Sequence, residues 1–166
     1  ACVIIVDNCS TDGTGAYLEG LTSQRRDEKS GRPATEIMIL SERENLGGAG
    51  GFYEGIRAAQ DRNLDWILVI DDDAMLRSNY NEVMTEFAAA NPGTAALAGS
   101  VYVDGKIHTM HRRNVRSRLL FVETEIPEED YRKSAFSCDC ATFCGLMVRG
   151  DIQQKIGLPE KDYFLW

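Results

Sequence analysis

Long apolar segments are missing from this 166-residue chain. No apolar run approaches the roughly 20 residues that a membrane-spanning helix needs. The start of the sequence also lacks a signal-peptide pattern, because Ala1 leads directly into a strand-like segment. Proline is scarce, at 4 residues, whereas hydrophobic residues make up 43%. This composition is typical of a globular protein, and the length fits one domain better than two.

Positive charge is also in short supply. The formal net charge is -8 and the sequence pI is about 4.8. A surface this acidic repels polyphosphate backbones, which excludes general nucleic-acid binding. A single nucleotide diphosphate remains compatible with this charge, because a bound divalent cation supplies positive charge locally.

The cysteines lack the even number and regular spacing of a disulfide framework, which favours a reducing compartment. There are five: Cys2, Cys9, Cys138, Cys140 and Cys144. The last three could be thiolate metal ligands, but a second paired knuckle is missing, and His108 and His111 belong to a different, basic segment. We favour the alternative in which these three alternate along a buried strand, where a free cysteine behaves as a small hydrophobic residue.

Three short apolar runs alternate with segments of helical spacing. The runs are residues 2–6, 36–40 and 66–70, and the helical segments are residues 14–21, 52–61 and 79–90. Runs of this kind are typical of strands that are buried on both faces. The alternation predicts an α/β fold, with a mostly parallel sheet covered by helices on both faces.

The rest of the chain is expected to be less regular. Residues 25–33 are predicted to form a solvated loop. A strand is predicted at residues 95–103, and Asp104-Gly105 is a hairpin turn signal into residues 106–110. Residues 111–133 are expected to form an extended, variable excursion, whose charges give a solvated face. The basic part of that face would be Arg112, Arg113, Arg116 and Arg118. A last strand at residues 143–148 and a helix at 151–156 complete the prediction.

Polar residues follow each of the three apolar runs. Asp7 and Asn8 end the first run, Asn45 and a glycine cluster follow the second, and Asp71 to Asp73 end the third. Ligands of open α/β sheets bind at the carboxyl ends of the strands. The sequence therefore predicts that these positions share one edge of the sheet.

The acidic triplet, Asp71, Asp72 and Asp73, predicts a metal site. Adjacent carboxylates repel one another unless a cation offsets their charge. Mg²⁺ and Mn²⁺ prefer such hard oxygen ligands, and they bind through one or two carboxylates together with substrate phosphates. The alternative is a helix N-terminus, where aspartate is favoured by capping and by the helix dipole. That alternative explains one aspartate more easily than three.

The glycine cluster and Asp7 each leave two alternatives open. The cluster, residues 47–51, opens a helix whose N-terminus could approach a diphosphate. It lacks the Lys-Ser/Thr ending of a P-loop, and such glycines equally serve a tight turn or close packing. Asp7 could accept hydrogen bonds from a base or a ribose, or it could cap the turn that follows it.

Taken together, four segments resemble the family-2-type glycosyltransferases of the GT-A fold. They are VIIVDNCSTDGT (residues 3–14), NLGGAGGFYEGIRAA (45–59), WILVIDDDAM (66–75) and FCGLMVRGDIQQKIGLPEKDYFLW (143–166). The wording NLGGAGGF is most similar to the galactofuranosyltransferase and rhamnosyltransferase-like branch. The resemblance implies a Rossmann-like GT-A core across residues 1–166, truncated at both ends because the family's first strand and helix would precede Val3.

The resemblance also implies residue roles. Asp7, Asn45, Gly47, Gly48, Asp71 and Asp72 would bind the donor nucleotide, and Asp72 and Asp73 would hold Mn²⁺ or Mg²⁺ against its diphosphate. Gly145 would shape the acceptor side. In the family an acidic general base follows the tryptophan that matches Trp166, so the base is expected just after this position. Glu160 and Asp162 are the nearest acids before it, and the family pattern argues against both.

The function that the resemblance implies is transfer of a sugar from a nucleoside-diphosphate donor, UDP- or dTDP-linked, to a glycan or glycolipid hydroxyl. Inversion at the anomeric carbon and a role in bacterial cell-surface polysaccharide or glycolipid synthesis are expected. The expected location is the cytoplasm, including the inner face of the plasma membrane. Two alternatives stay open: a phosphatase with Asp71 and Asp73 as its Asp-x-Asp pair, and a non-catalytic nucleotide-binding domain.

Overall fold

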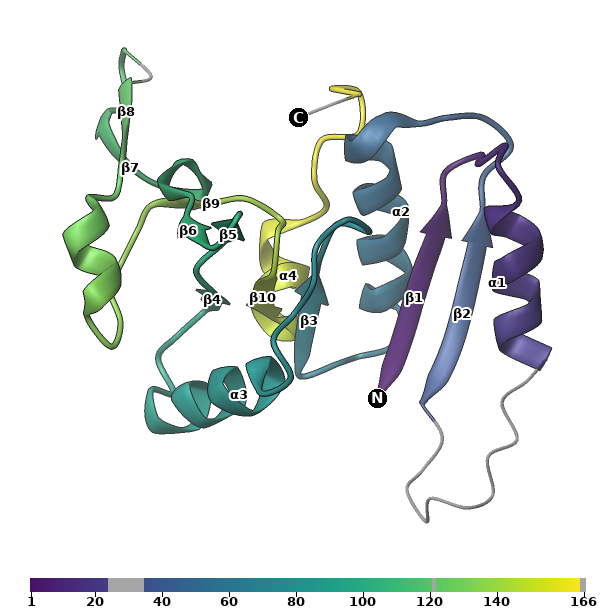
Figure 1. Ribbon diagram of the computed structural model, residues 1–166, viewed down its shortest axis with the longest axis horizontal. Helices are drawn as coiled ribbons and strands as arrows, with labels where there is room; N and C mark the ends of the chain where they lie inside the picture. Colours follow the sequence, from purple (N-terminus) through teal and green to yellow (C-terminus); the bar gives the residue numbers. More distant parts are fainter. Residues whose placement is uncertain (24–34, 121, 165–166) are drawn as a thin grey trace. The chain divides into compact units, whose positions relative to one another are not determined.

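The computed structural model describes residues 1–23, 35–120 and 122–164. The chain forms two compact units (Figure 1). The first unit consists of residues 1–65 and 153–166, and the second unit consists of residues 66–152. The loop predicted at residues 25–33 lies outside the described residues.

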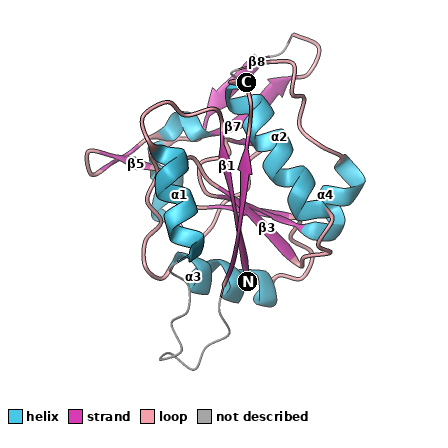
Figure 2. Ribbon diagram, turned by 90° about the vertical axis from the view of Figure 1, so that its right-hand side faces the viewer, coloured by secondary structure: helices cyan, strands magenta, loops and turns pink. Residues whose placement is uncertain are grey.

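The first unit is a β-strand pair with helices on both sides. Strands β1 (Cys2–Asp7) and β2 (Glu36–Ser41) are parallel, and Asp7 lies opposite Ser41 at their carboxyl ends. Helices α1 (Thr14–Ser23) and α2 (Gly47–Gln60) lie on opposite sides of this pair in both Figure 1 and Figure 2. Among the described residues of this unit, the buried apolar side chains come from the two helices: Leu18, Ala49, Ile56 and Ala59.

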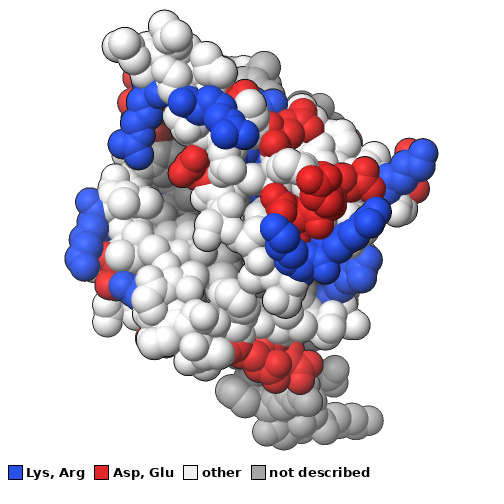
Figure 3. Space-filling view, turned by 90° about the vertical axis from the view of Figure 1, so that its left-hand side faces the viewer, with Lys and Arg blue, Asp and Glu red and all other residues white. Residues whose placement is uncertain are grey.

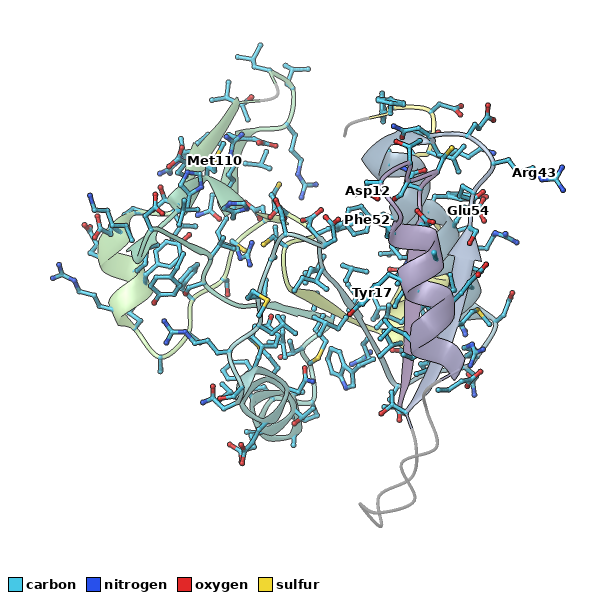
Figure 4. The ribbon with its side chains drawn as sticks, turned by 45° about the vertical axis from the view of Figure 1, so that its right-hand side comes forward. Asp12, Tyr17, Arg43, Phe52, Glu54 and Met110 are labelled. Atoms are coloured by element: carbon cyan, nitrogen blue, oxygen red, sulfur yellow. The ribbon has the colours of Figure 1, made fainter. Side chains whose placement is uncertain are left out.

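Local chemistry explains where the two helices begin. Asp12 accepts hydrogen bonds from the backbone N–H and the hydroxyl of Thr14, the first residue of α1, and these bonds lower the pKa of Asp12. Asp12 stands at this end of α1 in Figure 4, and exposed Arg43 extends to solvent from the loop before α2. The glycine cluster itself forms the first turn of α2. The helix therefore starts earlier than the predicted residues 52–61.

The second unit is built around a three-stranded sheet. Strand β10 (Leu146–Arg149) runs antiparallel between β3 (Trp66–Val69) and β4 (Ala96–Ala98). Leu146 lies opposite both Val69 and Ala98, so the start of β10 meets the carboxyl ends of both neighbours. Helix α3 (Tyr80–Ala90) connects β3 to β4, and α4 (Gly150–Ile156) follows β10 directly. The buried apolar residues described in this unit are Ile67, Ala88, Ile126, Met147 and Val148.

Short elements complete the second unit. The predicted hairpin is confirmed: β5 (Tyr102–Val103) pairs with β6 (Lys106–Ile107), and both turn residues have positive φ, 51° at Asp104 and 76° at Gly105. A 3₁₀ turn, η1 (Thr109–His111), leads into the predicted excursion. That excursion is more regular than expected, since it contains two paired antiparallel strands, β7 (Arg112–Ser117) and β8 (Val122–Glu125), followed by the 3₁₀ turn η2 (Glu128–Arg132). The later strand β9 (Cys140–Ala141) pairs with β7 and completes a three-stranded sheet.

The predicted solvated face is confirmed for Arg116 and Arg118, which are exposed, whereas Arg113 is half-buried and the prediction is wrong for Arg112. Basic and acidic side chains lie next to one another on the face that Figure 3 shows, and Arg113 pairs with Glu123 across β7 and β8. Arg112 is instead only 2% exposed. Its guanidinium donates hydrogen bonds to the backbone oxygens of His111 (2.6 Å) and Gly99, so backbone carbonyls replace water around the cation.

The cysteine prediction is wrong in one respect. Only Cys140 lies in a strand, β9, which is two residues long, whereas Cys138 and Cys144 lie outside strands. The three cannot alternate along one strand because β9 is too short. All three are half-buried, and burial raises the pKa of each thiol.

The α/β class is confirmed by this architecture. The strands β1 and β2 are parallel, and β3 and β4 share a direction because each is antiparallel to β10. The remaining described ladders are antiparallel. Among the described residues, no helix is long and apolar enough to cross a membrane.

Candidate functional site

The acidic triplet lines an open cavity of about 880 Å³ in the second unit. Asp71 to Asp73 follow β3, Gly145 precedes the start of β10, which pairs with the end of β3, and Gly99 follows the end of β4, which pairs with the same end of β10. The register of the sheet therefore brings these three segments to one edge. Tyr80 and His111 also line the cavity, as do the apolar side chains of Leu76, Val83, Met84 and Val101.

The three carboxylates of the triplet concentrate negative charge in the cavity. Asp71 is half-buried, whereas Asp72 and Asp73 are exposed. Burial raises the pKa of Asp71, and the charges of Asp73 and Asp72 raise it further. Within the described part of the chain, none of the three carboxylates forms an ion pair. A cation at this position would remove the repulsion.

The donor set fits a hard divalent cation that also binds a substrate. Across residues 1–23, 35–120 and 122–164, no three His, Cys, Asp or Glu side chains are grouped to hold a metal ion by themselves. Mg²⁺ typically binds one or two carboxylates and completes its shell with waters and substrate phosphates. Asp72 and Asp73 are exposed in the cavity and match that pattern.

Tyr80, the first residue of α3, connects two strand ends at the edge of the sheet that lines the cavity. Its hydroxyl donates to the backbone oxygen of Gly145 (2.5 Å) and accepts from the N–H of Gly99 (3.1 Å). A side chain at Gly99 would be 2.6 Å from the Tyr80 ring, and Gly145 has a φ of 71°, which favours glycine. One half-buried phenol thus links the end of β4 to the start of β10.

We predict that Tyr80→Phe lowers the free energy of unfolding by about 1–2 kcal/mol, because the Gly99 N–H and the Gly145 carbonyl both lose a half-buried partner. Denaturant unfolding measures the change. Tyr102→Phe is the matched control: the Tyr102 ring is 46% exposed and holds the Arg77 guanidinium 4.8 Å above it. Equal destabilisation of the two variants would contradict this hydrogen-bonding role of the Tyr80 hydroxyl.

His111 is a cavity residue that the sequence interpretation did not assign. Its Nδ1 lies 2.8 Å from the hydroxyl of Thr142, and its ring centroid lies 5.1 Å from that of His108. Burial lowers the pKa of His111, and the neighbouring His108 and Arg112 lower it further, against an opposing effect of Asp71. In the sequence His111 belongs to a segment without regular periodicity, which gave no reason to place it in the same cavity as the triplet.

The lowered pKa of His111 predicts a pH dependence of stability. The unfolded chain takes up this proton near pH 6.5, at a higher pH than the folded chain does. The contribution of His111 is therefore fully present above about pH 6.5 and is lost as the pH falls through the folded-state pKa. Between pH 7 and pH 5, we expect the free energy of unfolding to fall less in His111→Gln than in the unchanged protein. Denaturant unfolding at both pH values measures the two losses. Parallel losses would contradict this assignment.

In the first unit, Asn8 and Asn45 form a network at the carboxyl ends of β1 and β2. The Asn8 amide donates to the Asn45 side-chain oxygen (3.1 Å) and to the Gly47 carbonyl (3.0 Å). The Asn8 oxygen accepts from the N–H of Leu46 (2.9 Å), and the Asn45 oxygen accepts from that of Gly47 (2.8 Å). Two of the three predicted polar positions, after the first and second runs, are thus together.

Asp7 is 8% exposed, and its Oδ1 accepts the N–H of Ser10 (3.0 Å). The capping alternative is therefore present in the structure, and a role in base or ribose binding stays a prediction. The donor contacts that were predicted for Gly47 and Gly48 also stay a prediction. Gly48 is exposed, but Gly47 is buried. The third predicted position, the triplet, belongs to the second unit, so its place beside the other two also stays a prediction.

The carboxylate cluster follows a strand of an α/β fold and lines an open cavity, and strand ends of this kind are where open α/β sheets bind their ligands. The sequence profile of Glycosyl transferase family 2 matches residues 2–151. The chain therefore belongs to glycosyl transferase family 2, whose fold is GT-A. Comparisons with curated proteins and with solved structures gave no match.

Family membership confirms the predicted glycosyltransferase class and GT-A fold. Enzymes of this family generally transfer sugars from nucleotide-sugar donors to acceptors. The match ends at residue 151, so it adds nothing on residues 152–166. The galactofuranosyl or rhamnosyl branch remains a prediction.

Proposed function

We propose that this glycosyltransferase binds a nucleoside-diphosphate sugar at the acidic triplet through Mn²⁺ or Mg²⁺. The sugar is then transferred to the acceptor with inversion at the anomeric carbon. The observation that supports the proposal is the triplet itself. Three adjacent carboxylates without a cationic partner in the described chain lie in an open cavity, and burial and mutual repulsion raise the pKa of Asp71. A divalent cation would offset part of the carboxylate charge and could take oxygen ligands from both the protein and the diphosphate.

In this proposal Asp72 and Asp73 hold the cation, and Asp71 and Asp72 face the donor diphosphate. When bound, the cation stabilises the negative charge that develops on the departing diphosphate. Tyr80 holds the backbone of Gly145 and Gly99 beside the triplet, which keeps the edge of the cavity in place. The proton of the acceptor hydroxyl would pass to an acidic residue that follows Trp166.

The first unit supplies further proposed donor contacts. Asp7, Asn45 and Gly48 are proposed to contribute to the nucleoside side of the donor. Because the side chains of Asn8 and Asn45 already bind each other and the start of α2, we propose that Asn45 acts mainly by fixing the backbone. UDP- and dTDP-linked sugars are the proposed donors, and a glycan or glycolipid hydroxyl is the proposed acceptor. We place this reaction in bacterial cell-surface polysaccharide or glycolipid synthesis, at the cytoplasmic side of the membrane.

Thermal unfolding in the presence of nucleotides tests the proposal. UDP or dTDP at 100 times its dissociation constant, with Mn²⁺, should stabilise the protein by about 2.7 kcal/mol, which raises the melting temperature by roughly 5–10 °C. The shift should vanish when EDTA replaces Mn²⁺. A melting temperature that no nucleoside diphosphate changes would overturn the proposal.

Two other outcomes would support the alternatives. Release of phosphate from an aryl phosphate, dependent on Asp71 and Asp73, would indicate the phosphatase, which family membership disfavours. Nucleotide binding without sugar transfer, in a protein that includes the acidic residue expected after Trp166, would indicate the non-catalytic nucleotide-binding domain.

A further inference from the structure

Arg77 is the only lysine or arginine among the described residues that line the cavity of the acidic triplet. It follows the triplet in the loop before α3, and its carbonyl accepts a hydrogen bond from the N–H of Tyr80 (2.9 Å). This bond fixes the backbone of Arg77 at the turn where the helix begins. The residue is exposed, so a ligand in the cavity can reach its side chain.

The guanidinium of Arg77 lies on an aromatic ring and not against a carboxylate. It is 4.8 Å from the centroid of the Tyr102 ring, which belongs to β5 and also lines the cavity. In the described chain Arg77 forms no ion pair, although Asp73 precedes it by only four residues. Contact with the face of a ring is favourable for a cation and leaves its charge unneutralised. Arg77 therefore keeps a positive charge that no side chain of the described chain offsets.

The charges in the cavity favour a second cationic group beside a metal ion. One divalent cation carries two positive charges against the three carboxylates of the triplet, and a phosphate brings further negative charge. A guanidinium offers N–H donors in a planar arrangement that matches the oxygens of a phosphate. A phosphate in this cavity would gain from Arg77 both charge and hydrogen bonds that the triplet does not supply.

We propose that Arg77 binds a phosphate group of a substrate, and that Tyr102 is the positioning residue that keeps the guanidinium available for it. The phosphate belongs either to the donor diphosphate or to an acceptor that carries a phosphate. This inference deepens the proposed function and rests on it for the source of the phosphate. Without the Tyr102 ring, the guanidinium is free to pair with a carboxylate of the triplet, and such a pair would compete with the phosphate.

Calorimetric titration with UDP in the presence of Mn²⁺ tests the donor as the source. If Arg77 binds the donor diphosphate, Arg77→Met should weaken UDP binding about 10- to 100-fold, because charged hydrogen bonds are lost. Arg118→Met is the matched control, since Arg118 is exposed in the same unit but is not among the described residues that line the cavity. The control should keep UDP affinity within about twofold.

Titration of inorganic phosphate into the protein saturated with UDP and Mn²⁺ tests the acceptor as the source. If Arg77 binds a phosphate of the acceptor, UDP affinity is the same in Arg77→Met as in the unchanged protein. Inorganic phosphate should then bind the unchanged protein, and should bind Arg77→Met at least about 10-fold more weakly. Failure of Arg77→Met to weaken the binding of either UDP or inorganic phosphate would overturn the proposal.

Two variants of Tyr102 test its positioning role. Tyr102→Leu should weaken the same phosphate binding about twofold to fivefold, whereas Tyr102→Phe, which keeps the face of the ring, should not weaken it. Equal losses in the two variants would contradict this role. If the unchanged protein fails to bind UDP with Mn²⁺, the proposed function fails, and inorganic pyrophosphate then decides the role of Arg77. Pyrophosphate binding that Arg77→Met weakens supports that role, and binding that is absent or equal in the variant overturns it.

Discussion

Asp73→Asn is expected to weaken the binding of UDP in the presence of Mn²⁺ by on the order of 100-fold or more. Changes in the groups that merely orient metal ligands already cost about 10–100-fold, and this substitution removes a proposed ligand itself. The asparagine keeps the size of the side chain and removes one negative charge from the triplet. Calorimetric titration of UDP with Mn²⁺ measures the effect, and Asp72→Asn should behave in the same way.

We expect that Asp73→Asn does not lower the stability of the folded protein. Asp73 is exposed, and its charge raises the pKa of Asp71, so its removal relieves repulsion. We therefore expect an unchanged or slightly higher melting temperature without ligand. Asp104→Asn is the matched control, since it makes the same change of charge in an exposed turn where asparagine tolerates the φ of 51°. UDP affinity that is equal in the Asp73 and Asp104 variants would contradict the metal site.

Arg112→Ala is expected to lower the free energy of unfolding by about 3 kcal/mol or more. The substitution leaves a cavity at a position that is 2% exposed, and it removes both hydrogen bonds to the carbonyls of His111 and Gly99. One effect acts in the opposite direction. Burial lowers the pKa of Arg112, which shows that keeping the charge there is costly, and the substitution removes that cost.

Arg112→Met separates these effects, because methionine fills much of the volume and removes the charge but cannot donate to the two carbonyls. We expect it to cost about 1–2 kcal/mol, less than alanine. Arg118→Ala, at an exposed position of the same basic segment, should stay within about 0.5 kcal/mol of the unchanged protein. Denaturant unfolding compares the three. A cost for Arg112→Ala no larger than that for Arg118→Ala would contradict the buried role.

The parts of the fold that short-range patterns determine were predictable. The run Trp66 to Ile70 is apolar and ends at three aspartates, so both the strand and the carboxylates that follow it are predictable from neighbouring residues. Asp104-Gly105 likewise contains the two residue types that adopt the positive φ of a tight hairpin turn. Family resemblance added the GT-A fold and the glycosyltransferase class, which the match to residues 2–151 confirms.

Features that depend on distant partners were not predictable in this way. Nothing around Arg112 in the sequence shows that its partner is the carbonyl of Gly99, so it was assigned to the solvated face with its neighbours. The direction of β10 depends on pairing with β3 and β4, which come much earlier in the chain. Gly47 was associated with a diphosphate because glycines before a helix suggest one, whereas the group that lies against it is Phe164, from the opposite end of the sequence.

The most direct test of the central claim is whether metal and nucleotide bind at the same place. Binding of Mn²⁺, followed by electron paramagnetic resonance, should be at least about 10-fold tighter when UDP is present, and by linkage Mn²⁺ should tighten UDP by the same factor. In the double variant Asp72→Asn/Asp73→Asn this coupling should disappear. Coupling of equal size in the unchanged protein and the double variant, or no coupling in either, would contradict the assignment of the acidic triplet.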